Sequence, residues 1–411
     1  MKRGSRFLYA LDIGSSKMVL SAAAYCQNTH TLGPILIESQ PSKGIFKGVV
    51  SDMASLSDAI QSLCKRMEAK SGAKIVQMAV SINGDYIQAR QSVVAMALAE
   101  RGTRSVTKRD LEKLISQARI LGLELDEELL HEYPKGYSID RNNMILNPLG
   151  LQGRRFEMNL LLICAQAIYL ENIKRAIERA GFSASELVFC GVAASEAILL
   201  TQEKEKGVVL IDIGEALTNV LVYKNEILRF AKVLPFGGYN LSETIANHFK
   251  IPFELASGIK ESSLDLSADI SGSEDVMIKT DMHYRSIKKR QLMEIILPEI
   301  ENFIDMLKGA IEVDALMDMA GAQIVVTGGL SLLEGLLERI EHGLGLPVKM
   351  GVVRGLKDVP ASRASSYAAA IGLLNLQKEK HQKNKLKLIL GDRRKFFDVF
   401  DYVKTLYQDY F

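Results

Sequence analysis

Tryptophan is absent from this 411-residue chain, and cysteine is scarce. The four thiols stand far apart and match neither a CxxC pair nor a zinc-site spacing, so we expect reduced structural cysteines: Cys26, Cys64, Cys164 and Cys190. No apolar run reaches the roughly 18 residues that a spanning helix needs, and the N-terminus has no signal-peptide pattern. These absences predict a cytoplasmic protein without a transmembrane helix.

Excess charge of either sign is also lacking. The chain has 51 Lys and Arg against 49 Asp and Glu, a net charge of +2, which predicts no nucleic-acid partner. Hydrophobic residues make up 47% of the sequence and charged residues 24%, as in ordinary globular proteins. The length suggests several domains, each able to bury its own core.

An internal repeat indicates the fold. Phe7–Ile13 and Met18–Ala24 read as a hairpin with a turn at 14–17, and residues 207–214 and 219–223 read as a second one. Both turns begin at the glycine of the tetrapeptide Leu/Ile-Asp-Ile-Gly, so we interpret the hairpins as the starts of two related halves. Helical periodicity between the strands predicts an α/β fold, with helices expected at 51–70, 107–120, 168–180, 241–260, 289–308 and 333–342.

The first turn has the composition of a phosphate-binding loop. Gly14 lets backbone N–H groups approach an anion, and Ser15, Ser16 and Lys17 add hydroxyl donors and a positive charge. Asp12 at the strand end is suited to hold Mg²⁺ through water.

The second half supplies matching groups. Asp212 and Gly214 repeat the acid-tipped turn, and Gly328 and Gly329 follow a third strand, where backbone can approach a base or ribose closely. Two acid-tipped turns that face each other would clamp a polyphosphate and its metal. A structural role for each turn alone remains the alternative.

These motifs resemble the actin-like ATPase superfamily and, within it, the FtsA family of bacterial cell-division proteins. The segments 10–18, 47–52, 172–181, 233–238 and 366–372 are similar to the family's loops and connecting helices, and 129–140 with 147–153 resembles its characteristic inserted subdomain. The resemblance implies two actin-like domains around an ATP and Mg²⁺ cleft. It adds Thr218, Gly237, Gly238, Arg290 and Glu294 to the nucleotide-binding residues, although Arg290 and Glu294 also fit an exposed i,i+4 ion pair.

The resemblance also implies domain bounds. We expect a first actin-like domain at 1–83 and 158–195, an inserted α+β subdomain at 84–157, a second domain at 196–230 and 311–376 with a smaller subdomain at 231–310, a basic linker at 377–395 and an amphipathic helix at 396–411.

Two departures from the family pattern affect the chemistry. Glu215 stands where the family has glycine and puts a carboxylate near the expected phosphate position, and Leu330 replaces a third glycine beside the base. We therefore expect ATP binding with weak or no ATPase activity, and no catalytic base can be named.

Aromatic residues gather at the C-terminus, where the last 16 residues hold seven of the 27 Phe and Tyr. On a helix most of the apolar ones share one face. Residues 378–411 carry nine basic and five acidic side chains, a net charge of +4, which favours anionic lipid; a helix docked on the protein itself is the alternative. The predicted membrane-contacting residues are Phe396, Phe397, Phe400, Val403, Leu406, Tyr407, Tyr410 and Phe411.

The resemblance thus implies a protein that forms filaments with itself and, with other division proteins, tethers FtsZ filaments to membrane lipid at the cytoplasmic face of the inner membrane, at the division septum. A PilM-like nucleotide-binding platform of a pilus or secretion assembly, or a small-molecule kinase of the same superfamily, are the alternatives.

Overall fold

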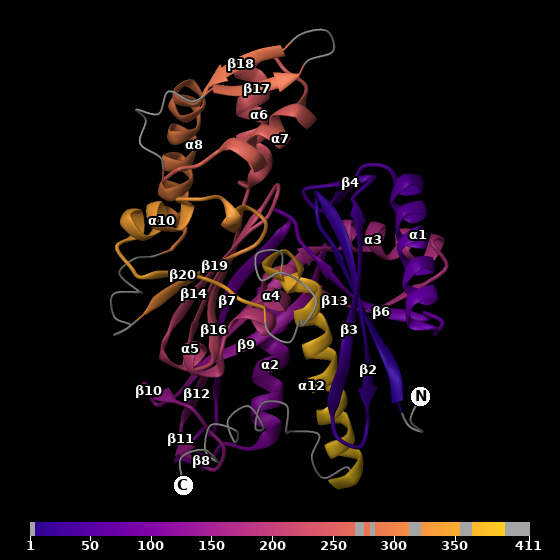
Figure 1. The fold of residues 1–411 in the computed structure, drawn as a ribbon. Helices are drawn as coiled ribbons and strands as arrows, with labels where there is room; N and C mark the ends of the chain where they lie inside the picture. Colours follow the sequence, from indigo (N-terminus) through magenta and orange to yellow (C-terminus); the bar gives the residue numbers. More distant parts are fainter. Residues whose placement is uncertain (1–4, 268–274, 280–283, 312–321, 354–363, 391–411) are drawn as a thin grey trace.

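The computed structural model describes residues 5–267, 275–279, 284–311, 322–353 and 364–390, which form two lobes (Figure 1). The first lobe is built on a five-stranded sheet in the order β13-β6-β1-β2-β3, flanked by α1 (Met53–Ser71) and α3 (Ala167–Arg179). The strands β1 and β2 form the predicted hairpin, pairing Ile13 with Met18. The strands of this sheet are β1 (Ser5–Ile13), β2 (Lys17–Cys26), β3 (Thr31–Pro41), β6 (Gln77–Ile82) and β13 (Ser183–Phe189).

The second lobe repeats this sheet in the order β20-β19-β14-β15-β16. In each sheet one antiparallel hairpin is extended by a third antiparallel strand on one side and by two parallel strands on the other. The structure thus confirms the internal repeat that the two Asp-Ile-Gly turns predict. The strands are β14 (Val208–Ile213), β15 (Thr218–Lys224), β16 (Ile227–Leu234), β19 (Gln323–Thr327) and β20 (Val348–Met350).

An inserted α+β unit contacts both lobes, through β13 and α3 of the first and through β16 of the second. Its sheet, β10-β9-β12-β7, packs against α2 (Lys108–Gly122), whose N-terminus has a capping box of Thr107 and Asp110. Arg104 Nη1 donates to Asp110 Oδ2 at 2.7 Å and fixes this cap. The strands of the unit are β7 (Ile87–Ala97), β8 (Arg104–Ser105), β9 (Glu127–Ile139), β10 (Asn142–Ile145), β11 (Gln152–Gly153) and β12 (Arg155–Gln166).

The smaller unit of the second lobe contains α6 (Gly238–Phe249), α7 (Phe253–Ser263) and α8 (Lys289–Ala310), with the hairpin of β17 (Asp275–Lys279) and β18 (Tyr284–Lys288). The single helix predicted for 241–260 is wrong. The chain leaves the helix at Lys250, which has a positive φ of 53°, and restarts after Pro252, whose ring cannot continue a helix interior.

Short elements connect these units. The helix predicted at 333–342 forms as α10, which begins three residues later than expected because a 3₁₀ turn precedes it. The remaining elements are β4 (Ile45–Phe46), β5 (Val49–Val50), α4 (Cys190–Ile198), α5 (Thr201–Lys206), η1 (Leu330–Leu332), α10 (Leu336–Leu344) and η2 (Ser365–Tyr367).

The helix α12 (Ala368–Leu390) packs against α4 and the first sheet. It continues through residues 377–390, so this part of the expected basic linker is helical; the segment has no glycine or proline to end the helix. Residues 391–395 and the predicted helix at 396–411 lie outside the described residues.

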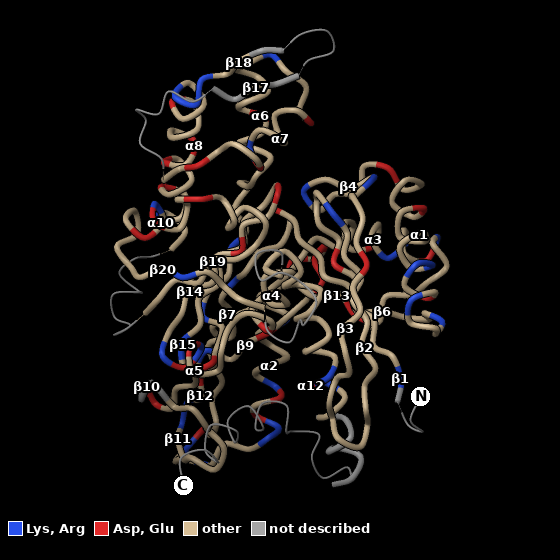
Figure 2. Tube along the Cα trace, viewed as in Figure 1, with Lys and Arg blue, Asp and Glu red and all other residues tan. Residues whose placement is uncertain are grey.

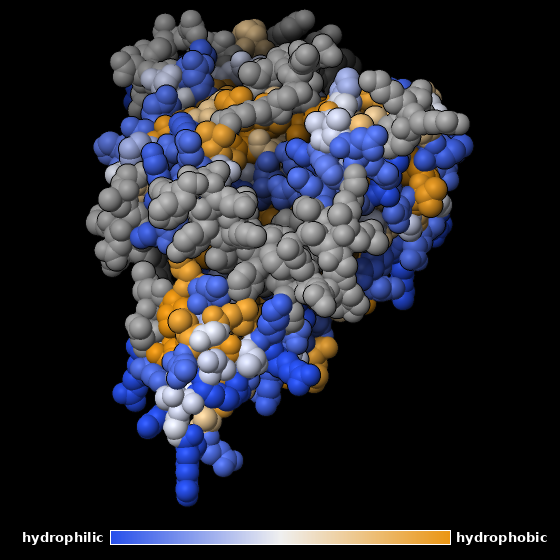
Figure 3. Space-filling model, turned by 90° about the horizontal axis from the view of Figure 1, so that it is seen from below, coloured by the Kyte–Doolittle hydropathy of each residue, from blue (hydrophilic) through white to orange (hydrophobic). Residues whose placement is uncertain are grey.

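The hydrophobic cores follow the units. One cluster fills the first lobe and extends past α4 and α12 to one face of the second sheet, a second lies between the other face of that sheet and its helices, and a third lies in the inserted unit. Charges of both signs alternate along the outer helices and loops, while the central strands carry few (Figure 2). Seen from below, hydrophilic residues cover much of the described surface, with apolar patches between them (Figure 3).

Candidate functional site

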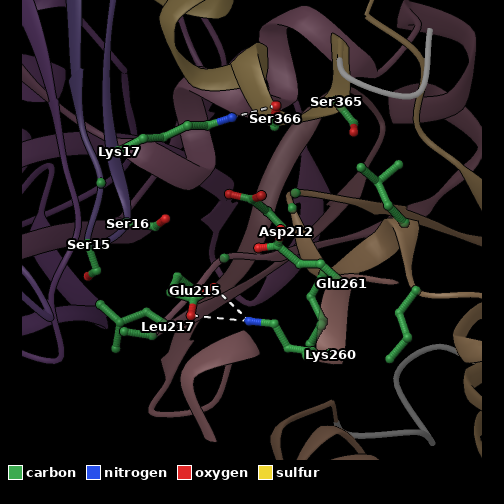
Figure 4. A pocket seen from close by; sticks show the side chains of 18 of the residues that line it. Ser15, Ser16, Lys17, Asp212, Glu215, Leu217, Lys260, Glu261, Ser365 and Ser366 are labelled. Carbon is green, nitrogen blue, oxygen red and sulfur yellow. Dashed lines mark hydrogen bonds and ion pairs between the residues drawn. The ribbon is translucent and has the colours of Figure 1, made fainter. Parts of the chain in front are cut away.

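A cavity of about 1330 Å³ lies between the two lobes, and both Asp-Ile-Gly turns open into it. Ser15 and Ser16 stand on one side, Asp212 lies near the centre, and Lys260 reaches toward Glu215 (Figure 4). Nine residues of the predicted nucleotide-binding set line this cavity: Asp12, Gly14, Ser15, Ser16, Lys17, Asp212, Gly214, Gly328 and Gly329.

The two turns have the same backbone geometry. The N–H of Gly14 donates to the carbonyl of Lys17 at 3.2 Å, and the N–H of Gly214 donates to that of Leu217 at 2.9 Å. A Cβ on Gly14 would lie 2.8 Å from the Lys17 oxygen, so a side chain there would force the turn open. Glycine at this position therefore keeps the turn tight.

Asp12 lies at the end of β1, where the Ser81 hydroxyl donates to its carboxylate. Burial, together with the negative charge of Asp212, raises the pKa of Asp12 to about 6, against the lowering effects of the Ser81 hydrogen bond and the Lys17 ammonium. The carboxylate thus lacks a full set of partners for its charge.

Asp212 occupies the equivalent position at the end of β14. Asn219 Nδ2 donates to its Oδ2 at 3.1 Å, and the Cys190 thiol lies 3.8 Å from the same oxygen. Burial raises the pKa of Asp212 as well. The Cys190 thiol, expected to be a reduced structural cysteine, belongs to the wall of the cavity.

These groups fit a hydrated divalent cation. Two carboxylates with raised pKa values gain from a nearby positive charge, and Mg²⁺ keeps most of its waters, so it needs few protein oxygens. The side-chain oxygens of Asn219 and Ser365 are buried at the cavity without a hydrogen-bond partner and suit a water or a ligand. Within the described part of the chain no cluster of three or more His, Cys, Asp and Glu forms a cage of direct ligands.

Lys17 brings positive charge to the first turn. Its Nζ donates to Ser366 Oγ at 2.7 Å and lies 4.6 Å from the centre of the Tyr367 ring. Ser366 and Tyr367 line the cavity from η2, immediately before α12. Lys17 therefore connects the phosphate-type turn with the start of α12.

Glu215 does not point a free carboxylate into the cavity. Lys260 Nζ lies 3.2 Å from both carboxylate oxygens and also donates to the carbonyl of Gly238 at 3.1 Å. Burial raises the pKa of Glu215, and the Lys260 ammonium opposes this effect. The repulsion of phosphate expected from the sequence is thus countered by a cation that periodicity alone does not reveal.

The glycine pair after β19 has two different roles. Gly328 has a positive φ of 91°, and a Cβ there would lie 2.3 Å from the carbonyl oxygen of Ile213. Gly329 has open space around its Cβ position. Leu330, expected to crowd the base, is buried and lines the cavity.

Five predicted nucleotide-binding residues are not among those that line the cavity. Thr218 is fully buried and donates to the Phe236 carbonyl at 2.8 Å, and Gly237 and Gly238 pack on the second turn. Arg290 and Glu294 form an exposed i,i+4 ion pair at 2.9 Å. A nucleotide contact by any of these five stays a prediction.

Sequence reasoning missed several lining residues: Cys190, Lys260, Glu261, Ser365 and Ser366. They come from α4, α7 and η2, whose periodicity reports burial and not which residues face a distant loop. No short motif marks them in a single sequence.

The predicted membrane-contacting residues, from Phe396 to Phe411, lie outside the described residues. Among the helices that the structure describes, none is long and apolar enough to cross a membrane.

Two family models match the chain. The model "Cell division protein FtsA" matches residues 209–372, and "SHS2 domain inserted in FTSA" matches residues 84–164, the region of the inserted unit. The two matches cover the second lobe and the insertion.

Curated relatives extend over nearly the whole chain. "Cell division protein FtsA" of Pseudomonas aeruginosa is 28% identical over 385 residues, 92% of this chain and 91% of that protein. The protein of the same name in Escherichia coli K12 is 27% identical over 414 residues, 98% of this chain and 96% of that protein.

Solved structures agree on the fold. The "PilM-PilN type IV pilus biogenesis complex" has a chain with a TM-score of 0.63 and 16% identity, covering 90% of this chain and 98% of that one. MreB5 of Spiroplasma citri bound to ADP gives a TM-score of 0.54 at 13% identity, covering 92% and 98%. The fold is that of the actin-like ATPases, as the sequence predicts.

Proposed function

Because this chain belongs to the FtsA family of cell-division proteins, we propose that it binds ATP with Mg²⁺ in the cleft, polymerises through its actin-like body and tethers FtsZ filaments to the inner membrane at the division septum. The observation that carries the nucleotide part is the pair of matching turns that face one cavity, each with an aspartate whose pKa burial raises.

Asp12 and Asp212 would hold the Mg²⁺ through water, and Lys17 with the Gly14 and Gly214 turns would hold the phosphates. The metal, when bound, supplies positive charge to the polyphosphate. The protein's part is to orient the phosphates between the lobes and to balance Glu215 with Lys260. We propose weak or no hydrolysis, because Glu215 stands where the family pattern has glycine and where backbone would meet phosphate.

Isothermal titration of the full chain with Mg-ATP tests this part. We expect saturable binding that weakens without Mg²⁺ and in the variant Asp212→Asn. Asp305→Asn is the matched control, since this exposed carboxylate pairs with Lys308 on α8, lies outside the cavity lining and should leave binding unchanged when it is lost. The absence of binding near millimolar Mg-ATP would overturn the nucleotide part.

The membrane part rests on the sequence of the last residues. An aromatic face at 396–411 follows a basic stretch, which favours attraction to anionic lipid and then apolar burial. The acidic residues of this segment lower the affinity of a single copy for anionic lipid, so a filament that presents many copies would bind the membrane far more tightly. We also propose the domain bounds expected from the sequence, with the basic stretch starting inside α12.

Co-sedimentation with anionic liposomes tests the anchor. The full chain should pellet with the vesicles, and a chain ending at Arg394 should stay in solution with an unchanged thermal midpoint. Adding purified FtsZ polymers should bring them to the vesicles only with the full chain. Recruitment of vesicles by the shortened chain would contradict the anchor.

A PilM-like platform is the second candidate, because a solved PilM–PilN complex shares the fold. Such a protein would dock a short peptide of a membrane partner and would have little need for its own anchor. Liposome binding lost with residues 395–411 favours the tether over the platform.

A further inference from the structure

Each lobe braces its phosphate-type turn with a neighbouring segment. In the first lobe Ser42 Oγ donates to the carbonyl of Gly14 at 2.6 Å, and the backbone N–H of Lys47 donates to Ser15 Oγ at 3.0 Å. Residues 42–47, which include β4 and are not among those that line the cavity, therefore hold the turn at 14–17.

The second lobe has a matching brace at 237–239. The N–H of Gly238 donates to the carbonyl of Gly214 at 3.1 Å, and the N–H of Tyr239 donates to that of Glu215 at 2.6 Å. A Cβ on Gly237 would lie 2.5 Å from the Glu215 backbone, so this segment lies directly on the turn.

The two braces touch each other across the cleft. The ring of Phe46, from β4, meets the ring of Tyr239, from α6, edge to face with centroids 4.9 Å apart. Tyr239 also packs on Phe253 at the start of α7, again at 4.9 Å. Phe46 is 38% exposed, and neither it nor Tyr239 is among the residues that line the cavity.

We propose that Phe46 and Tyr239 form a clasp that sets the separation of the two phosphate-type turns and that has to open when a nucleotide enters or leaves the cleft. They are positioning residues, because they act on the ligand only through the turns that their segments brace. This inference rests on the proposed nucleotide binding and goes beyond it, since it assigns the exchange rate to a contact outside the cavity.

The geometry explains why an aromatic pair is suited to this role. Edge-to-face rings attract by an amount that thermal motion can overcome, unlike a buried core contact. A half-exposed pair can separate without opening either hydrophobic core. The pair also joins the two segments that hold the turns, and a contact that served stability alone would not need this position.

Stopped-flow measurements with a fluorescent ATP analogue and Mg²⁺ test the clasp on the full chain. In Phe46→Ala and Tyr239→Ala we expect both association and release to be about two- to tenfold faster, in line with the strength of one aromatic pair. Phe46→Tyr and Tyr239→Phe retain a ring and should restore the original rates. Phe7→Ala is the matched control, because Phe7 stacks on Tyr9 at 5.9 Å within one strand of the first lobe.

Hydrogen exchange without nucleotide gives a second readout. The amides of Lys47, Gly238 and Tyr239 should exchange faster in Phe46→Ala and remain at the original rate in Phe7→Ala. If the original chain binds the analogue and both alanine variants keep its rates, or if these amides are unaffected, the clasp is wrong. If the original chain binds no analogue, the nucleotide proposal fails instead, and the amide rates still decide whether the rings hold the turns.

Discussion

Lys260 and Glu215 form an ion pair at the wall of the cavity, with the ammonium 3.2 Å from each carboxylate oxygen. The lysine side chain is 6% exposed and the glutamate side chain 24%, so water screens the pair only in part. The pair joins the second turn to α7, a helix of the smaller unit. A residue that departs from the family pattern is thus accompanied by a partner that compensates its charge.

Removing the lysine should destabilise the protein. In Lys260→Gln the Glu215 carboxylate keeps its burial and loses its cation, so we expect a loss of about 1–3 kcal/mol, below the range for fully buried pairs. Glu215→Gln should cost less when combined with Lys260→Gln than the sum of the single changes. Thermal unfolding measures both.

The exposed pair of Arg290 and Glu294 supplies the control. Its side chains are 69% and 54% exposed, and Arg290→Gln should change stability by less than about 0.5 kcal/mol. Equal losses from Lys260→Gln and Arg290→Gln would show that the cavity pair is as screened as a surface pair.

The glycine pair after β19 offers a matched comparison within two adjacent positions. Gly328→Ala places a methyl group 2.3 Å from the Ile213 carbonyl at a positive φ of 91°, so we expect a loss of about 1–3 kcal/mol and weaker nucleotide binding through the displaced turn. Gly329→Ala has open space and a φ of −65°, and it should fold and bind as before. A Gly328→Ala variant as stable as the original chain would contradict this prediction.

The sequence was sufficient to predict the hairpins and their Asp-Ile-Gly turns. A strand, a glycine turn and a second strand are local features, and the second copy at Asp212 confirmed the pattern of Asp12 within one chain. The helix predicted at 107–120 is local in the same sense, and it forms as α2 with a capping box of Thr107 and Asp110 at its start. Local chemistry of this kind is fixed by a few neighbouring residues.

Contacts between distant segments could not be predicted in this way. Lys260 is 45 residues from Glu215 in the sequence. The single helix predicted for 241–260 also missed the break at Pro252, which separates α6 from α7. Cys190 reaches Asp212 because α4, which begins at this cysteine, contacts β14, and no periodicity reports this contact. Thr218 has a sequence position typical of a ligand contact, yet the pairing of β15 with β16 turns it toward Phe236.

Lys17 should contribute most of the positive charge that a nucleotide meets at the first turn. In Lys17→Met we expect Mg-ATP affinity to fall about 10- to 100-fold, the value of a charge-assisted hydrogen bond. Lys43→Met is the control, since Lys43 is exposed on the neighbouring segment and does not line the cavity. Ser366→Ala separates the roles: it removes the 2.7 Å partner of Lys17 and leaves the charge, so a loss as large as that of Lys17→Met would assign the effect to the hydrogen bond with η2.

The raised pKa of Asp12 makes stability depend on pH in a defined direction. The folded protein holds the Asp12 proton up to a pKa of about 6, whereas the unfolded chain releases it near the usual 3.8. Protonation of Asp12 therefore contributes fully to the free energy of unfolding below about pH 4, and this contribution is lost as the pH rises to about 6. The loss is at most about 3 kcal/mol, because Asp12 faces the open cavity. Other carboxylates titrate in the same range, so the difference between the original chain and Asp12→Asn isolates this group.

Thermal midpoints between pH 4.5 and 7 should fall faster in the original chain than in Asp12→Asn, and Asp58→Asn, an exposed change on α1, should follow the original chain. Mg²⁺ binds the ionised carboxylate, so its stabilising effect should grow as the pH rises through 6 and should be weaker in Asp12→Asn. The opposite result would be midpoint-against-pH curves of the original chain and Asp12→Asn that run parallel with and without Mg²⁺. The negative charge of Asp12 would then be balanced by groups of the protein itself, and the two aspartates would not need a cation.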